Sequence, residues 1–469
     1  MKNYLFIFSL LFSLLGNLNN MFAQIPNNID LLYNWTDESL IPSIYYNNTY
    51  NEIWGFVHEN REYAVIGSSM GTHIFDVTDT ENVTQIDFIE GKFVGEEVVH
   101  RDYHDHNGYL YMVCDEGPSS LQIASLHSLP DSLTLVYDSD ELFMTSHNIF
   151  IDTATTKMYV CVPRHTNGAY NGLEVYDLAN PVEPELLTIY NDYYAHDVYV
   201  KNDITYFHGQ EDGFFVVDFS NTDNPQLLGS LTDYDEFGQG YNHSGWLSED
   251  GNYYFSTDEN HGLDIKVLDV SDFSDMKVVS LINSGVSESS MAHNVMVRGN
   301  YLYVAYYHDG LQIYDITNPL IPYKISDYKT YLPTDHESYR GAWGVYTGLP
   351  SGNILVSDMQ YGLFVFDVGL NPISTNENMS IVTKENKIML YPTIVQQTMH
   401  IEVDIQAQTN ALIQLFDVTG NVVFRHKVRV IPENHHYEIR LPNDLPTGYL
   451  FFTLKTEQDF FSGKILKID

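Results

Sequence analysis

Apolar and polar residues alternate along most of this chain in short runs that predict β-strands, and residues 292–323 show the pattern most clearly. Three runs follow one another there: Val295–Val297, Tyr301–Val304 and Leu311–Asp315. Gly-Asn and Asp-Gly pairs separate the runs, and these residue types tolerate the positive φ of a tight hairpin. The stretch therefore predicts an antiparallel meander, with a fourth strand after an Asn-Pro break.

The meander recurs seven times, at a spacing of roughly 41 to 52 residues that is typical of four-stranded propeller blades. An apolar-x-apolar-x-Asp motif closes the third run of six copies, at Asp76, Asp177, Asp218, Asp269, Asp315 and Asp367, and Ser125 stands there in the second copy. We interpret these aspartates as Asx turns rather than calcium ligands. The last copy lacks a fourth run, and Ile29–Trp35 resembles one. The sequence thus predicts an all-β, seven-bladed β-propeller closed by its N-terminal strand.

Other segments of the chain have different patterns. Residues 1–23 contain Lys2, the apolar run Leu5–Leu15 and a cleavage point after Ala23, which predicts a cleaved signal peptide; the rest of the chain suggests no membrane span. The propeller is assigned to residues 24–369, and residues 370–386 form a polar linker. Residues 387–469 alternate in short runs that predict a small Ig-like β-sandwich.

Charge and cysteine content limit the classes of partner. The chain has 22 Lys and Arg against 63 Asp and Glu, a formal net charge of −41. Such a surface repels nucleic acid and anionic membranes and favours solubility and cation binding. Cys114 and Cys161 are the two cysteines, so no cysteine-based metal or redox motif is present; whether they pair is left open.

The repeat motifs resemble a known family. GLEVYDLANPVEP, GFFVVDFSNTDNP and GLQIYDITNPLIP are similar to the LVIVD repeat. Together with Ile53-Trp54-Gly55, Arg101-Asp102 and the His-Asn and His-Asp blade starts, the arrangement resembles the choice-of-anchor B family. This resemblance implies a secreted or surface propeller, and it implies no particular biochemical activity.

The C-terminal segment resembles the type A sorting domain of the type IX (Por) secretion system. The matching elements are Tyr391-Pro392, the Phe416–Val423 hairpin, Leu445–Tyr449, Lys464 and Lys467. Thr393 departs from the usual pattern, in which Asn-Pro follows Tyr-Pro. The resemblance implies a Bacteroidetes-type protein that engages the type IX machinery and becomes extracellular or attached to the outer-membrane surface. It leaves open whether the mature protein is anchored or released.

Candidate chemistry is concentrated at the starts of the blades. The first strand of a propeller blade lines the central channel, so equivalent positions should surround one channel mouth: Trp54, Arg101, His147, His196, His243, His293 and Trp343. Of these, His147, His196, His243 and His293 are the candidate metal ligands, with Asn148, Asp197, Ser244 and Asn294 following them. Neutral imidazoles with acceptors behind them suit Zn²⁺, Mn²⁺ or Fe²⁺. Repeated histidines equally suit hydrogen bonds to the neighbouring blade, and no cofactor is established.

Two further groups could contact a ligand. Arg101, Asp102, Trp54 and Trp343 form the candidate ligand-binding set, in which Arg101 would hold an anionic group. Turns after the second strands supply a candidate general base or further metal ligands, or simply polar groups facing water: Asp115, Glu116, Arg164, His165, His208, Glu211, Asp212, Asp258, Glu259, Asn260, His261, His308, Asp309 and Asp358.

The sequence contains no nucleophile elbow, serine triad, phosphate-binding glycine loop, zinc-protease helix or EF-hand loop, and no catalytic residue is assigned. The first hypothesis is therefore a secreted or cell-surface binding module for a surface glycan or protein. The alternative is a metal-dependent extracellular lyase or hydrolase with the histidines at its centre.

Overall fold

The computed structural model describes residues 29–370, except residues 235, 236, 334 and 337, together with residues 388–391, 394–395, 398–403, 409–416, 422–430, 436–442, 445–455 and 460–467. The predicted signal peptide lies outside the described residues, as does the predicted linker apart from Leu370. The chain divides into two compact units, Met1–Pro372 and Ile373–Asp469.

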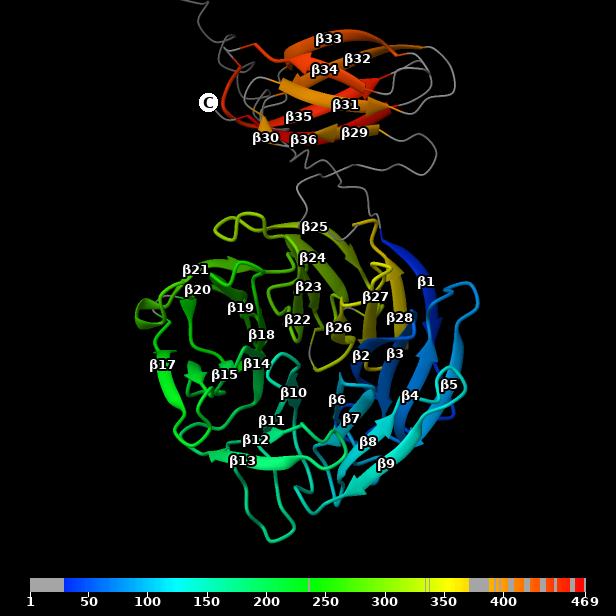
Figure 1. Ribbon diagram of the computed structural model, residues 1–469, viewed down its shortest axis with the longest axis vertical. Helices are drawn as coiled ribbons and strands as arrows, with labels where there is room; N and C mark the ends of the chain where they lie inside the picture. Colours follow the sequence, from blue (N-terminus) through cyan, green and yellow to red (C-terminus); the bar gives the residue numbers. More distant parts are fainter. Residues whose placement is uncertain are drawn as a thin grey trace, which may run out of the picture. The chain divides into compact units, whose positions relative to one another are not determined.

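The first unit is a seven-bladed β-propeller, which confirms the predicted fold. Seven four-stranded antiparallel sheets surround a central axis (Figure 1). In each blade the first strand of the repeat lies innermost, and the later strands follow outward in sequence order. The last blade takes its outer strand from the N-terminus, β1. The first strands therefore line the channel, and their side chains determine which chemical groups face it.

Blade 1 contains β2 (Tyr50–His58), β3 (Arg61–Ser68), β4 (Gly71–Asp76) and β5 (Thr84–Glu90). Blade 2 contains β6 (Arg101–His106), β7 (Tyr109–Cys114), β8 (Leu121–Ser125) and β9 (Thr134–Ser139). Blade 3 contains β10 (Ile149–Asp152), β11 (Lys157–Cys161), β12 (Leu173–Asp177) and β13 (Glu185–Tyr190). Blade 4 contains β14 (Asp197–Lys201), β15 (Ile204–His208), β16 (Phe214–Asp218) and β17 (Gln226–Leu231).

Blade 5 contains β18 (Asn242–Leu247), β19 (Tyr253–Asp258), β20 (Ile265–Asp269) and β21 (Lys277–Ile282), with the short 3-10 turn η2 (Phe273–Asp275) before β21. Blade 6 contains β22 (Val295–Arg298), β23 (Tyr301–Ala305), β24 (Leu311–Asp315) and β25 (Tyr323–Tyr328). Blade 7 contains β26 (Ala342–Tyr346), β27 (Ile354–Asp358), β28 (Gly362–Asp367) and β1 (Asp30–Trp35).

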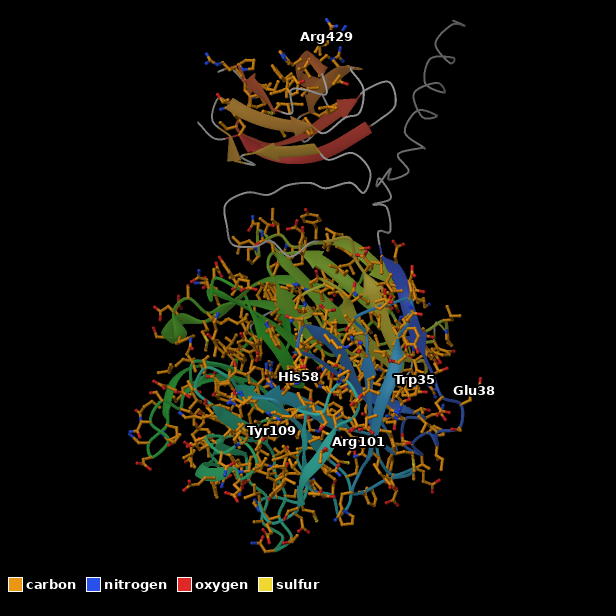
Figure 2. The ribbon with its side chains drawn as sticks, turned by 45° about the vertical axis from the view of Figure 1, so that its right-hand side comes forward. Trp35, Glu38, His58, Arg101, Tyr109 and Arg429 are labelled. Carbon is orange, nitrogen blue, oxygen red and sulfur yellow. The ribbon has the colours of Figure 1, made fainter. Side chains whose placement is uncertain are left out.

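The N-terminal strand β1 covers the outer edge of β28. The pairing is antiparallel, with Asp30 opposite Asp367 and Trp35 opposite Leu363. Trp35, labelled in Figure 2, also packs on blade 1. Its ring lies 4.8 Å from the ring of Phe75. One strand therefore joins the last blade to the first and removes an open sheet edge that could pair with another chain.

The aspartates that close the third strands form the predicted turns. In each case a carboxylate oxygen accepts a hydrogen bond from the backbone N–H two residues later, at Asp76, Asp177, Asp218, Asp269, Asp315 and Asp367. This local bond ends the strand and starts the loop to the outer strand. The Asx-turn interpretation is confirmed, and it explains why the motif recurs in nearly every blade.

The second unit contains two sheets. The smaller one has the order β29–β31–β34 and the larger one the order β30–β36–β35–β32–β33. Their strands are β29 (Ile388–Tyr391), β30 (Ile394–Val395), β31 (Thr398–Val403), β32 (Thr409–Phe416), β33 (Val422–Val430), β34 (His436–Arg440), β35 (Gly448–Lys455) and β36 (Phe460–Lys467). Buried apolar residues from both sheets, including Met399, Ile413 and Leu454, form one core.

The two cysteines lie at corresponding ends of β7 and β11. Cys114 and Cys161 are both buried and both carry free thiols. Among the described residues, no helix is long and apolar enough to cross a membrane.

Candidate functional site

Six aromatic side chains form a closed circle at the channel mouth where the first strands begin. This mouth ring consists of His100, His147, His196, His243, His293 and Trp343, and neighbouring ring centroids are 4.2–5.5 Å apart around the whole circle. All four predicted histidines and Trp343 belong to it. The sequence therefore located five of the six members, one from each of blades 3 to 7.

Arg101 was expected in this ring, and that expectation is wrong. Its guanidinium is 3% exposed and bonds the backbone of the loops beside it, from Nε to the Ser68 carbonyl (2.8 Å) and from Nη2 to the Phe93 carbonyl (2.7 Å). An added Cβ at Gly91 would collide with it. Arg101 therefore joins blade 2 to blade 1 and does not face the channel.

His100 occupies the place in the ring that was assigned to Arg101. Its ring stacks on His147 at 4.5 Å with an interplanar angle of 22°, and its Nε2 lies 2.8 Å from the Asn148 side-chain oxygen. The cause is a difference in strand register: β18 and β26 each bulge by one residue at His243 and Trp343, whereas β6 pairs regularly from its first residue. The sequence signal for His100 was its position immediately before Arg101-Asp102.

Trp54 was also expected in the mouth ring, and it lies instead toward the opposite end of the channel. Corresponding residues of the seven first strands form an aromatic collar there: Trp54, His104, Phe150, Tyr199, Trp246, Met296 and Tyr346. The Trp54 indole lies 4.2 Å from the His104 ring and 4.9 Å from the Tyr346 ring. The collar lines an open cavity of about 580 Å³ at this second mouth.

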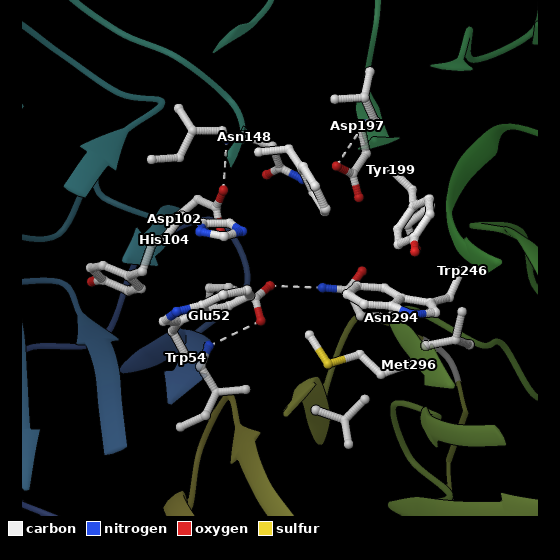
Figure 3. Close-up of a pocket in the computed structure, with 18 of the residues that line it drawn as sticks. Glu52, Trp54, Asp102, His104, Asn148, Asp197, Tyr199, Trp246, Asn294 and Met296 are labelled. Carbon is white, nitrogen blue, oxygen red and sulfur yellow. Dashed lines mark hydrogen bonds between the residues drawn. The ribbon is translucent and has the colours of Figure 1, made fainter. Parts of the chain in front are cut away.

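Between the mouth ring and the collar lies a polar layer, shown in Figure 3, around an interior cavity of about 70 Å³. Asp102 and Asp197 face it, and Asn294 donates to the Glu52 carboxylate at 2.7 Å. Burial raises the pKa of Asp102 to about 7 and that of Asp197 to about 6. The Asp102 carboxylate accepts from the Ile149 backbone N–H at 2.7 Å. Asp102 is thus a channel-lining residue joining blades 2 and 3.

The mouth ring is mostly neutral, with one cationic member. Burial lowers the pKa of His100 and of His293 to about 3 and holds the pKa values of His196 and His243 well below their usual range. Burial also opposes protonation of His147, but the Asp115 carboxylate, 2.8 Å from Nδ1, raises the pKa of His147 to about 9. The ring therefore presents neutral imidazole nitrogens beside one paired imidazolium.

Two ring histidines bond the neighbouring blade, as the structural interpretation anticipated. Nδ1 of His196 donates to the His243 carbonyl at 3.2 Å, and Nδ1 of His293 donates to the Trp343 carbonyl at 2.6 Å. Because a carbonyl only accepts, Nδ1 carries the proton and Nε2 keeps a lone pair. A structural bond on one nitrogen therefore leaves the other available to a ligand, so the two interpretations are compatible.

The turn residues after the second strands divide between the mouth and the interior. Asp115, Glu116 and Glu259 line the mouth pocket. Others have structural partners: His208 bonds Asn242 and Tyr254, Asp258 is buried in an ion pair with Lys266, and Asp358 accepts the backbone N–H groups of Gln360 and Tyr361. His165 bonds the buried Glu174.

The mouth pocket has a volume of about 350 Å³ and combines aromatic walls with acidic groups. It is lined by Tyr45, Tyr46, Val99, His100, Asp115, Glu116, His147, His196, Glu259, Tyr339 and Trp343. Tyr45 is 62% exposed and Tyr46 is 40% exposed at the rim, and the Tyr46 ring lies 5.1 Å from that of Tyr339 in an edge-to-face contact. A second depression, lined in part by Glu211 and Tyr241, shares Glu259 and Tyr339 with it.

Comparison with known proteins supports the repeat assignment. The model of the LVIVD repeat matches residues 194–233, 243–283 and 289–330, which correspond to blades 4, 5 and 6. The chain is therefore a seven-bladed β-propeller that contains LVIVD repeats. No match was found among curated proteins.

Among solved structures, a protein from Lactobacillus plantarum is 14% identical with a TM-score of 0.47, covering 83% of this chain and 99% of that one. The periplasmic gluconolactonase of Pseudomonas aeruginosa is 11% identical with a TM-score of 0.48, covering 84% and 99%. The computationally designed Ika8 protein is 9% identical with a TM-score of 0.44, covering 70% and 98%. At these scores the likenesses carry no inference about ligand or activity.

Proposed function

We propose that the propeller is an interaction module that binds a glycan at the mouth pocket. The observation that carries this proposal is the convergence of exposed tyrosines and acidic acceptors on one concave site above the mouth ring. Tyrosine rings provide flat apolar surfaces for sugar rings, and carboxylates accept hydrogen bonds from hydroxyl groups. A pocket of this size with a few convergent polar groups is typical of ligand sites.

The enzymatic alternative has no hydroxyl or thiol nucleophile of the serine, threonine or cysteine type among the described residues that line the mouth pocket. The thiol of Cys114, near this mouth, lies 3.7 Å from the Glu116 carboxylate, and burial raises its pKa to about 11. It therefore stays protonated, and the thiolate is the reactive form. Among the described residues that line the mouth pocket there is no serine or threonine. These observations disfavour catalysis by a serine, threonine or cysteine nucleophile, so the enzymatic alternative would have to use the carboxylates and histidines of the pocket.

Replacing both Tyr45 and Tyr46 by alanine should weaken glycan binding by about 30-fold, because each ring contributes on the order of 1 kcal/mol of stacking. The melting temperature should hardly change, since exposed side chains contribute little to stability. The measurement is a glycan array with the full-length protein, followed by calorimetric titration of the strongest binder.

Ile321→Ala is the matched control, because Ile321 is 68% exposed in the loop from β24 to β25, at the opposite end of the propeller. The control should bind like wild type. Equal affinities for the tyrosine double variant and the control would contradict the proposed face. Peptide binding without any glycan binding would contradict the ligand class.

We also propose that the chain acts at the cell surface, as a choice-of-anchor B protein exported by the type IX secretion system. The sequence features of residues 1–23 and 387–469 support this proposal, together with an acidic composition suited to an exposed surface. Binding at a propeller mouth then brings the cell, or the released protein, to an external glycan.

Deleting residues 387–469 should leave the chain in the periplasm, because the machinery would have no sorting signal to recognise. The measurement is protease accessibility on intact cells and fractionation, in a Bacteroidetes host with a type IX system. Full-length protein in a strain without that system is the control and should show the same retention. Unchanged surface exposure of the truncated chain would contradict the export route.

A further inference from the structure

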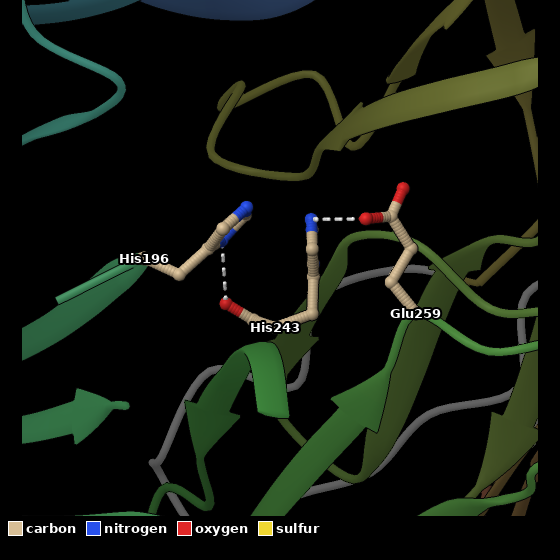
Figure 4. Close-up of side chains that lie close together, drawn as sticks. All are labelled: His196, His243 and Glu259. Atoms are coloured by element: carbon tan, nitrogen blue, oxygen red, sulfur yellow. Dashed lines mark hydrogen bonds and ion pairs between the residues drawn. The ribbon is translucent and has the colours of Figure 1, made fainter. Parts of the chain in front are cut away.

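Three side chains from blades 4 and 5 converge at the edge of the mouth ring (Figure 4). One ligand atom from each of His196, His243 and Glu259 lies within 4.8 Å of the others. His196 immediately precedes β14, His243 sits in the bulge of β18, and Glu259 follows β19 directly. Two of the three thus come from the repeated ring position, and the third comes from the adjacent turn.

The two imidazoles are fixed in place before any ligand binds. His196 is held by the bond from Nδ1 to the His243 carbonyl, which leaves the Nε2 lone pair available. His243 is 3% exposed, and its Nε2 lies 3.8 Å from a Glu259 carboxylate oxygen. Its buried Nδ1 has no hydrogen-bond partner among the described residues.

Glu259 is oriented toward these imidazoles, and among the described residues it has no ion-pair contact shorter than 3.8 Å. The Tyr307 hydroxyl donates to one of its oxygens, and that same oxygen is 3.9 Å from Nε2 of His293. The ring histidine with a short carboxylate contact, His147, is paired with Asp115 at 2.8 Å rather than with Glu259. A bound cation would give the Glu259 carboxylate a closer partner.

We infer that His196, His243 and Glu259 bind one divalent transition-metal ion. Two imidazoles and one carboxylate suit Zn²⁺ and its neighbours rather than Ca²⁺ or Mg²⁺, which prefer all-oxygen sites. Ligand atoms in a tetrahedral zinc site are about 3.3 Å apart, so small side-chain rotations would close the observed separations. The site adds to the proposed function, because His196 and Glu259 also line the mouth pocket.

The full-length protein, stripped with a chelator and dialysed, should bind about one equivalent of Zn²⁺ in a calorimetric titration, and Co²⁺ should give the visible absorption of a low-symmetry site. Glu259→Gln should weaken Zn²⁺ binding by more than about 100-fold, since loss of even outer-shell groups costs 10- to 100-fold. His243→Gln should do the same. Circular dichroism and the melting temperature report whether each variant folds.

His147→Gln is the matched control, because His147 belongs to the same ring and lines the same pocket without contributing to the cluster. It should bind Zn²⁺ about as tightly as wild type, because all three ligands of the cluster are unchanged. A folded wild-type protein that binds no Zn²⁺, or equal affinities for Glu259→Gln and His147→Gln, would overturn the inference. The Tyr45→Ala/Tyr46→Ala variant should keep the metal, so failure of the metal site and failure of glycan binding are separable.

Discussion

Arg101→Met should lower the free energy of unfolding by about 3–6 kcal/mol, because the buried Arg101 guanidinium bonds backbone carbonyls of blade 1 and the loop after it. The variant removes two short charge-assisted bonds to the Ser68 and Phe93 carbonyls and leaves these acceptors inside the fold. Methionine fills a similar volume, so the loss reflects hydrogen bonding rather than a cavity. Urea unfolding at pH 7, followed by tryptophan fluorescence, measures this change in the free energy of unfolding.

Two companion variants separate this structural role from the ligand-binding role that the sequence suggested. Arg101→Lys keeps the charge but cannot reach both carbonyls at once, so it should recover only a minor part of the lost stability. Arg164→Met makes the same chemical change at an exposed arginine and should cost about 1 kcal/mol or less. An Arg101→Met protein as stable as wild type but unable to bind glycan would contradict the structural assignment.

The fold was predictable because its signals are local and repeated. Each blade contains the same alternation of apolar residues and, in six of seven copies, the same strand-ending aspartate, whose Asx turn needs only the two following residues. Seven copies of such a unit have few ways to bury their apolar faces other than a closed ring. The position of β1 followed from a missing outer strand, which is again a property of the repeat.

The mouth ring was predictable only where the blades share the same register. His196, His243 and His293 follow the repeat and were located from it. In blade 2 the absence of a one-residue bulge places His100 in the ring and turns Arg101 toward blade 1. A bulge depends on how two strands pair, and that pairing is decided by tertiary contacts rather than by the residues of the bulge alone.

The proposed metal site combines a repeated residue with a residue specific to one blade. His196 and His243 were expected together, whereas Glu259 was one of many polar turn residues with no ranking among them. Its neighbour Asp258 points inward and pairs with Lys266, whereas Glu259 faces the histidines of the mouth ring. Which one faces the mouth depends on the twist of β19 at its last residue, which periodicity alone does not define.

Buried titratable groups make opposing contributions to the pH dependence of stability. Burial lowers the pKa of His100, His208 and His293 to about 3 and of His73 and His104 to about 4. The unfolded chain therefore binds more protons than the folded chain below about pH 6.5, and these histidines cost stability as pH falls. The buried carboxylates of the polar layer act in the opposite direction.

Asp102→Asn should stabilise the protein at pH 8 by up to about 4 kcal/mol and should have little effect at pH 4. Burial raises the pKa of Asp102 to about 7, from 3.8 in the unfolded chain. Between about pH 4 and pH 7, the Asp102 carboxyl therefore keeps its proton in the folded state and has lost it in the unfolded state. The contribution of Asp102 is present below pH 4 and is lost as pH rises through 7, at about 1.4 kcal/mol per pKa unit.

An asparagine at this position keeps the essential contact and cannot ionise. Its side-chain oxygen can still accept from the Ile149 N–H, and its amide faces the polar cavity shared with Glu52 and Asp197.

The measurement is urea unfolding of both proteins at pH 4, 6 and 8 with chelator present. The quantity compared is the difference in unfolding free energy between the variant and wild type, because the histidine contributions cancel in it. Asp223→Asn, at an exposed carboxylate, should show no such trend. A difference independent of pH, or a less stable variant at pH 8, would mean that the Asp102 charge is compensated inside the channel, and the cavity would then have to be regarded as a cation site.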